Sequence, residues 1–360
     1  MTGKQTRSTA RKATPAPVRP TAVQPPPGPH VAVLGAGNWG TTIAHLIASN
    51  GNAVRLWTRS SELADAIRTE RVNRRYLDGF DLSEHIWPTN DLALAVRGAR
   101  MIVMVIPSSG FRAVCRQLAP LVEPDQAIVH ATKGLEQHTY RRMSQIVLEE
   151  TCVRRYAVIS GPNIAREIME GKPSGTVVAS PFPRLIERVS GLLTGPTFRV
   201  YTNDDVAGVE LGGALKNIIA IGAGISAGLQ LGENTRALLI TRGLGEIMRL
   251  SLSFGARAET FSGLAGIGDL MVTCASEHSR NFRLGRGLAA GKDVATITAQ
   301  LGMVAEGVNT VAVAHDFVRE HNVYAPVIEA IHAIVHGGQH PIEAIRELMV
   351  LDARPDVDLG

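Results

Sequence analysis

The chain has 360 residues, of which 45% are hydrophobic and 19% are charged, a composition typical of a globular protein. Its formal net charge is +4, and residues 1–29 contain five basic and no acidic side chains. The rest of the chain therefore carries a net charge of −1. Because the body of the protein is not basic, we expect no nucleic-acid partner. The length predicts about two domains.

Residues 1–29 form a basic leader that holds seven of the 19 prolines and no run of large apolar residues. Such a segment buries too little surface to offset the entropy of ordering, so we predict that it is disordered. It also lacks the apolar core of a secretory signal. A passive extension is the favoured interpretation, and an organelle-targeting peptide or a binding arm are the alternatives.

The three cysteines, Cys115, Cys152 and Cys274, lie far apart in the sequence and form no CxxC pattern. This odd and scattered set suits neither a disulfide framework nor a zinc site, so we predict a reducing, cytoplasmic location. We predict no metal site. No stretch of about 18 apolar residues runs without polar interruptions, so we also expect no membrane span.

The first predicted domain spans residues 30–205. Residues 30–37 predict a strand that ends in glycine, 38–50 a helix and 52–57 a second strand, which together make a βαβ unit with parallel strands. Runs rich in Val and Ile, typical of strands buried on both faces, follow at 101–107, 126–131, 156–161, 175–180 and 198–202. Helical patterns lie between most of them. The prediction is an α/β domain with a doubly wound, mainly parallel sheet.

The second predicted domain spans residues 206–350 and is all-α. No strand pattern interrupts the predicted helices at 206–229, 235–255, 281–291, 307–322 and 325–337. Residues 351–360 are polar, and we predict a flexible tail there.

The motif Gly35-Ala36-Gly37-Asn38-Trp39-Gly40 joins the first predicted strand to the first helix. In this context GxGxxG indicates dinucleotide binding. Gly35 permits a tight turn, Gly37 lets the backbone approach a pyrophosphate, and Gly40 lets the helix pack close to the strand. An ordinary glycine-rich turn is the alternative.

The end of the second predicted strand bears on the choice between NAD and NADP. A carboxylate at this point binds the ribose 2′-hydroxyl of NAD, but the chain has Trp57-Thr58-Arg59 there, and Glu62 comes only later. Arg59 could pair with a 2′-phosphate, which favours NADP or tolerance of both cofactors. A solvated loop arginine is the alternative.

Lys216 is the only charged residue between Glu210 and Glu233, in a stretch rich in Gly, Ala and Ile. Its ammonium either reaches water past the apolar surface or points into a cleft, where burial lowers its pKa. A lysine of the second kind can donate a proton at neutral pH. The neighbouring Asn217 is a candidate ligand to a substrate or a phosphate.

Two further segments carry candidate charges. Residues 263–281 place Asp269 between glycine-rich loops and end in Ser279-Arg280-Asn281 at a predicted helix start, which indicates an anion site. Lys133 follows the strand predicted at 126–131, and ligands of open α/β sheets lie beyond the carboxyl ends of strands. The alternative for residues 263–281 is a capping turn with a surface arginine. The alternative for Lys133 is an ordinary surface lysine.

Together these segments resemble the NAD(P)-dependent glycerol-3-phosphate dehydrogenase family of the bacterial biosynthetic type. The resemblance covers nearly all of residues 30–350. ELGGALKN followed by GLAGIGDL and SRN is its most specific part, and GAGNWGTTIA, ATKGLE, SGPNIAREI and VAEGV occur in the family order.

The resemblance implies an N-terminal Rossmann domain and a helical C-terminal domain. It implies reduction of dihydroxyacetone phosphate to sn-glycerol 3-phosphate with NADH or NADPH, for phospholipid synthesis, and family habit favours a homodimer. A 3-hydroxyacid dehydrogenase and a non-catalytic dinucleotide sensor are the alternative functions.

The resemblance also assigns roles to residues. Lys216 matches the catalytic proton donor, Lys133 a second lysine that contacts substrate and cofactor, and Asp269 the carboxylate that holds the substrate and a lysine. The remaining matches are the phosphate site Ser279, Arg280 and Asn281, with Arg280 also near the cofactor; the substrate-side Gly161 and Asn163; and the cofactor positions Asn38, Trp39, Arg59, Tyr76, Ala165, Val304 and Glu306. Asn38 and Asn163 depart from the serine common in the family.

Overall fold

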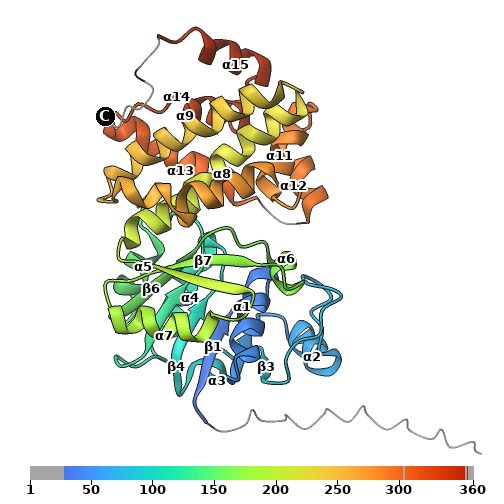
Figure 1. Cartoon of the computed structure of the whole chain (residues 1–360), viewed down its shortest axis with the longest axis vertical. Helices are drawn as coiled ribbons and strands as arrows, with labels where there is room; N and C mark the ends of the chain where they lie inside the picture. Colours follow the sequence, from blue (N-terminus) through green and yellow to red (C-terminus); the bar gives the residue numbers. More distant parts are fainter. Residues whose placement is uncertain (1–27, 303–304, 353–354, 356–360) are drawn as a thin grey trace, which may run out of the picture.

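The computed structural model describes residues 28–302, 305–352 and 355. Nearly all of the leader predicted to be disordered, most of the predicted tail and the candidate cofactor residue Val304 lie outside these residues. A sheet flanked by helices forms one half of the molecule, and a group of helices forms the other (Figure 1). This arrangement confirms the predicted α/β and all-α architecture.

The described residues of the first half form one eight-stranded sheet in the order β3-β2-β1-β4-β5-β6-β7-β8. All neighbouring strands are parallel except β6 and β7, so the sheet is mainly parallel as predicted. The strands are β1 (His30–Leu34), β2 (Val54–Trp57), β3 (Ile86–Thr89), β4 (Ala99–Met104), β5 (Ala127–His130), β6 (Arg155–Ser160), β7 (Ser174–Ala179) and β8 (Phe198–Asn203). The strand order reverses at β1, where open α/β sheets bind their ligands.

The sequence analysis missed strand β3. Its four residues, IWPT, include Pro88, which cannot donate a ladder hydrogen bond and so weakens a strand pattern. The strand lies at the edge of the sheet, where a proline is tolerated because one side of the strand has no partner.

Helices cover both faces of the sheet because its central strands are apolar on both sides. The helices of this half are α1 (Asn38–Ser49), α2 (Ser61–Glu70), α3 (Leu92–Val96), α4 (Ser108–Leu118), α5 (Met143–Glu150), α6 (Ala165–Met169) and α7 (Pro183–Leu193). In β1, Val31 and Val33 pack in one core with α1 and α7, and Ala32 and Leu34 pack in another with α3, α4 and α5.

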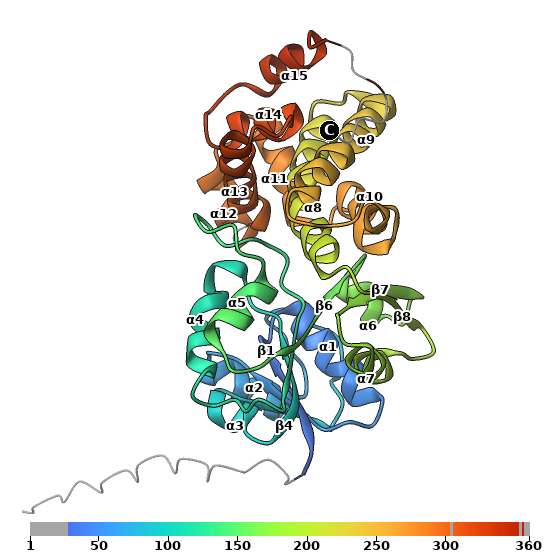
Figure 2. The same ribbon diagram turned by 90° about the vertical axis from the view of Figure 1, so that its left-hand side faces the viewer.

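The second half is built around α8 (Val206–Gly228), which is buried along nearly its whole length and also contacts β6 (Figure 2). The surrounding helices are α9 (Gly232–Leu252), α10 (Asp269–Ala275), α11 (Arg280–Ala289), α12 (Val294–Leu301), α13 (Glu306–His321), α14 (Pro326–Val335) and α15 (Pro341–Met349). Glycines let α8 and α11 touch: a Cβ at Gly224 would lie 2.0 Å from the Phe282 oxygen, and one at Gly285 2.0 Å from the Ile221 oxygen.

By length and composition alone, α8 could cross a membrane, and among the described residues it is the one helix that could. Its most apolar 18-residue window is 94% buried inside the protein. The core helix of a globular protein passes the same test of length and composition.

The glycine-rich segment before Asp269 is helical, so the prediction of a loop there was wrong. A 3₁₀ turn (Ala258–Ser262) and a π-helical turn (Leu264–Gly268) run directly into α10. Glycine makes this possible, because a Cβ at Gly266 would lie 2.2 Å from the Phe261 oxygen. Asp269 is therefore the first residue of α10, and the turn that precedes it packs closely against the Phe261 backbone.

Candidate active site

Two lysines and one carboxylate meet between the two halves of the molecule. Lys216 Nζ donates to Asp269 Oδ1 at 2.6 Å, and Lys133 Nζ donates to Asp269 Oδ2 at 2.7 Å. Lys133 also donates to the Gly161 carbonyl at 3.0 Å. The three charges come from α8, from the loop after β5 and from α10. The fold thus joins three segments that the sequence analysis treated separately.

Lys216 is 6% exposed, so of the two interpretations its ammonium follows the buried one. Burial lowers the pKa of Lys216 to about 8, against the attraction of the Asp269 carboxylate, and the nearby Lys133 charge lowers it further. Lys216 also donates to the Thr273 hydroxyl. A lysine with this pKa can hold and release a proton near neutral pH.

A cavity of about 350 Å³ opens beside this cluster. Eleven of the candidate site residues line it, from both halves of the chain: Asn38, Tyr76, Lys133, Asn163, Ala165, Lys216, Asp269, Ser279, Arg280, Asn281 and Glu306. Asn217 lines it as well. Of the charged side chains among its described lining, four are cationic and three are acidic, which suits an anionic ligand.

The other candidates lie outside the described lining of this cavity. Gly35, Gly37, Trp39 and Gly40 belong to the turn between β1 and α1, and Gly161 contributes its carbonyl to Lys133. Arg59 is exposed just after β2. Its proposed contact with a 2′-phosphate stays a prediction.

The glycine turn fits a dinucleotide. Gly35 has a φ of +113°, and a Cβ there would lie 2.2 Å from the Val105 oxygen; a Cβ at Gly40 would lie 1.8 Å from the Gly35 oxygen. At Gly37, by contrast, a Cβ would meet no described atom within 4 Å beyond its neighbours. In the described structure α1 has no side-chain cap and no acidic residue in its first turn. Open space before an uncapped helix start is what a pyrophosphate requires.

The start of α11 combines capping with anion-binding features. The Ser279 hydroxyl accepts from the Phe282 amide at 3.2 Å, so this residue is a helix cap, as the alternative interpretation allowed. Arg280 begins the helix and lines the cavity. Asn281 is buried, and its Oδ1 accepts from the Gly307 amide at 3.0 Å, which joins α11 to the start of α13.

The surroundings of Glu306 and Asn163, which both line the cavity, could not be read from the sequence. Burial raises the pKa of Glu306, although Arg280, Lys133 and Lys216 oppose this shift. Asn163 donates to the Gly175 carbonyl at 3.1 Å and accepts from the Thr176 hydroxyl at 2.9 Å. The Asn163 amide is therefore used to brace β7.

The sequence analysis missed two residues that shape the site. Asn73 is buried and donates to the Ala36 carbonyl at 2.9 Å and to the Thr41 hydroxyl at 2.8 Å, which holds the glycine turn. No local pattern marks Asn73. Thr273, the partner of Lys216, lies one helical turn after Asp269, and a helical assignment of residues 269–275 could have found it.

Comparisons with known proteins identify the family of the chain. The model of the NAD-dependent glycerol-3-phosphate dehydrogenase N-terminus matches residues 30–185, and that of the C-terminus matches residues 205–346. Glycerol-3-phosphate dehydrogenase (NAD(P)+) of Geobacter sulfurreducens is 45% identical over 329 residues, which are 91% of this chain and 98% of the relative.

Solved structures give the same result. The crystal structure of glycerol-3-phosphate dehydrogenase from Coxiella burnetii has a TM-score of 0.86 and 40% identity, and covers 90% of this chain and 99% of its own. A ketopantoate reductase from Ralstonia eutropha, 15% identical with a TM-score of 0.56 over 88% of this chain and all of its own, shares the fold alone. The expected cofactor, NAD or NADP, is confirmed at the level of the family. The chain belongs to the NAD-dependent glycerol-3-phosphate dehydrogenase family.

Proposed function

We propose that the protein reduces dihydroxyacetone phosphate to sn-glycerol 3-phosphate with NADH or NADPH. One observation carries the proposal: a buried lysine whose pKa is lowered to about 8 shares Asp269 with a second lysine beside a cavity of mixed charge. This arrangement suits a carbonyl that must gain a proton while its oxygen becomes negative.

In this proposal Lys216 is the proton donor. Its ammonium and that of Lys133 lie close enough to share Asp269, and both would stabilise the charge that develops on the carbonyl oxygen. Lys216 then gives its proton to that oxygen. Asp269 keeps both lysines in place, and Thr273 fixes the position of the Lys216 ammonium. A bound reduced nicotinamide supplies the hydride.

The substrate phosphate belongs at the start of α11. The Arg280 guanidinium and the positive end of α11 form an anion site there, with Ser279 and Asn281 on either side. The reaction leaves the phosphate unchanged, so its binding energy can hold the carbonyl against the lysines. Gly161 and Asn163 support the substrate side through backbone contacts.

For the cofactor, the turn of Gly35, Gly37 and Gly40 accepts the pyrophosphate. Its open helix start supports this assignment. The remaining cofactor contacts are assigned by family position to Asn38, Trp39, Arg59, Tyr76, Lys133, Ala165, Arg280, Val304 and Glu306. Arg59 gives NADPH a small preference over NADH.

The finer assignments are also proposals. We place the domain boundary between β8, which ends at Asn203, and α8, which begins at Val206. The three cysteines are free, and Cys115 and Cys274 are buried, which supports work in a reducing cytoplasm. We further propose a homodimer that supplies phospholipid synthesis and needs no nucleic-acid partner. Sedimentation equilibrium tests the dimer.

One assay tests the central proposal. Purified protein is mixed with dihydroxyacetone phosphate and either NADH or NADPH, and oxidation of the cofactor is followed by absorbance at a fixed pH. We expect turnover with both cofactors, faster with NADPH. Bound cofactor without turnover of this substrate would instead support the dinucleotide-sensor alternative. Turnover of a 3-hydroxyacid in place of glycerol 3-phosphate, in the oxidative direction, would support the other dehydrogenase.

A further inference from the structure

We propose that Glu210 is a positioning residue that sets the distance between the two lysine-bearing segments. Glu210 contacts neither the cavity nor Asp269 in the described structure. It ties α8, which carries Lys216, to the start of α5 and lies against the end of β5, which leads to Lys133. The inference rests on the proposed function, because its main readout is turnover of dihydroxyacetone phosphate.

Glu210 lies on α8 but takes all its polar side-chain contacts from the sheet domain. Its carboxylate accepts from the Ser144 amide and hydroxyl, both at 2.8 Å, and from Arg142 Nη1 at 2.5 Å. His130 Nε2 lies 3.0 Å from Oε1. Glu210 is 5% exposed, so these groups take the place of water around it.

The carboxylate is ionised throughout the working pH range. Burial alone would raise the pKa of Glu210, but the contact with His130 and the charge of Arg142 lower it to about 2. A buried charge with several fixed donors tolerates little displacement, because moving the carboxylate leaves either it or the Arg142 cation unpaired. The contact therefore fixes α8 against the sheet domain.

The position of this contact in the chain gives it a catalytic consequence. His130 ends β5 three residues before Lys133, and Glu210 precedes Lys216 by six residues on α8. Between them, a Cβ at Gly213 would lie 3.4 Å from Lys133 Cγ, so the stem of Lys133 packs against α8 itself. The Glu210 contacts and the shared Asp269 thus hold the same two segments at two points. Removing the first leaves the spacing to Asp269 and to the packing of α8 on Lys133 and β6.

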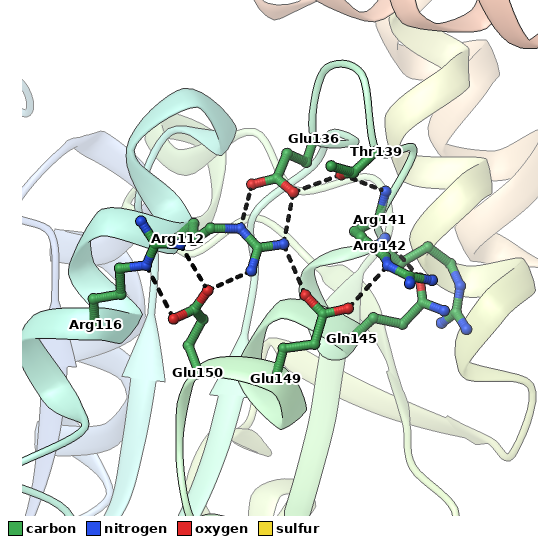
Figure 3. Close-up of polar contacts among 9 residues, drawn as sticks. All are labelled: Arg112, Arg116, Glu136, Thr139, Arg141, Arg142, Gln145, Glu149 and Glu150. Atoms are coloured by element: carbon green, nitrogen blue, oxygen red, sulfur yellow. Dashed lines mark hydrogen bonds and ion pairs between the residues drawn. The ribbon is translucent and has the colours of Figure 1, made fainter.

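Helix α5, whose start provides the partners of Glu210, is itself held in place by ion pairs with Arg112. Arg142 and Ser144 stand at the start of α5, whose far end carries Glu149 and Glu150. Arg112 binds both of these glutamates and also Glu136 in the loop after Lys133 (Figure 3). The base against which Glu210 holds α8 is therefore braced on its other side.

The matched control is Asp205, five residues earlier at the N-cap of the same helix. It is also buried and also accepts three hydrogen bonds, from the Gly208 amide at 2.8 Å, the Arg257 amide at 2.9 Å and the Thr260 hydroxyl at 2.6 Å. All these partners belong to the helical half of the chain. Asp205→Asn therefore disturbs the stability of α8 without touching its contact with the sheet domain.

The test compares Glu210→Gln and Asp205→Asn in the full-length protein. We measure kcat, KM for dihydroxyacetone phosphate, the Kd of NADPH from tryptophan fluorescence, and Tm. We expect both variants to lower Tm. Glu210→Gln lowers kcat at least tenfold with the Kd of NADPH within twofold, whereas Asp205→Asn keeps kcat within twofold. Amide hydrogen exchange speeds up over residues 130–134 and 206–216 in Glu210→Gln, and over 206–216 but not over 130–134 in Asp205→Asn, which loses only the helix cap.

Equal losses of kcat in the two variants, or an unchanged kcat in Glu210→Gln, overturn the inference. If Glu210→Gln does not fold, Ser144→Ala removes one donor and is expected to lower kcat two- to fivefold with the Kd of NADPH unchanged; an unchanged kcat again overturns it. If the wild-type protein does not reduce dihydroxyacetone phosphate, the proposed function fails. The exchange measurement then decides on Glu210 by itself: faster exchange confined to those segments supports its role, and unchanged exchange refutes it.

Discussion

Two clusters of charged side chains use the same chemistry for different ends. Around Arg112, the arginines Arg112, Arg116 and Arg141 meet Glu136, Glu149 and Glu150 (Figure 3). Arg112 binds Glu136 with two parallel hydrogen bonds of 2.6 and 2.7 Å. Each positive charge in this cluster has an acidic partner. The charges of the three arginines and three glutamates balance, and the cluster holds α4, α5 and the loop after β5 together.

The cluster at Asp269 is unbalanced. Two ammonium groups share one carboxylate, and the described lining of the cavity beside them holds four cationic and three acidic side chains in all. Lys216 in this cluster is buried, whereas Arg112 in the other cluster keeps 21% of its side chain exposed. A buried excess of positive charge costs stability unless a ligand balances it. The comparison teaches that the imbalance, rather than the number of ion pairs, marks the functional cluster.

Loss of Lys216 is the strongest test of this comparison. Lys216→Ala should lower kcat by roughly 10²- to 10⁴-fold, because it removes the proton donor. The protein should stay folded and bind NADPH normally, since Lys133 still pairs with Asp269. Steady-state kinetics, circular dichroism and a fluorescence titration measure the three quantities. Turnover close to that of the wild type would refute the acid role.

Loss of Arg280 should act on binding. Arg280→Ala is expected to raise KM for dihydroxyacetone phosphate by roughly 10- to 100-fold, in line with about 1.5–3 kcal/mol for a hydrogen bond to a charged group. The effect on kcat should be smaller, because the guanidinium binds a phosphate that does not react. Inhibition by inorganic phosphate should weaken in parallel. An unchanged KM would place the phosphate elsewhere.

The pH dependence of reduction should follow Lys216. Since its pKa is lowered to about 8, the proton donor is present below that pH and lost above it. The value of kcat/KM, which reports the pKa values of the free enzyme, should therefore be level near neutral pH and fall about tenfold per unit above pH 8. The measurement is kcat/KM from initial rates at substrate concentrations well below KM, from pH 6 to 10. A level profile up to pH 10 would mean that chemistry with this proton does not limit the rate.

Loss of Arg112 should have the smallest effect on activity. Arg112→Gln breaks a network of partly exposed ion pairs, one of them bidentate, so we expect Tm to fall by several degrees and kcat to stay within about twofold. Differential scanning calorimetry and the standard assay measure both. A tenfold loss of kcat would show that the balanced cluster also contributes to the site, and the contrast drawn above would fail.

Local patterns predicted much of the fold. The β1–turn–α1–β2 unit was predictable because strand, glycines and helix follow one another within 28 residues. Strand β3 was not, since Pro88 disguises it, and the segment before Asp269 was taken for loops because its glycines serve a π-helical turn packed on Phe261. The sequence shows the glycines, but it does not show the close contact with Phe261 that requires them.

The candidate site was predictable residue by residue but not as an arrangement. The isolation of Lys216 in an apolar stretch pointed to a special environment, and the structure brings it to Asp269, 53 residues away. The contributions of Asn73 and Glu210 were not predictable, because each depends on partners brought near by the fold: Ala36 for Asn73, and Ser144 for Glu210. Pairing across such separations leaves no periodic trace in a single sequence.

The burial of helix α8 also bears on how the protein loses activity when it unfolds. The same helix is the centre of the helical core and the carrier of Lys216, and glycine contacts with α11 leave it little room to move. Segments of this kind open only when the whole domain opens. Heat or denaturant therefore has no partly unfolded, inactive state to populate at this helix. Loss of Lys216 from the site and unfolding of the helical half become a single event, so activity persists only while that half stays folded.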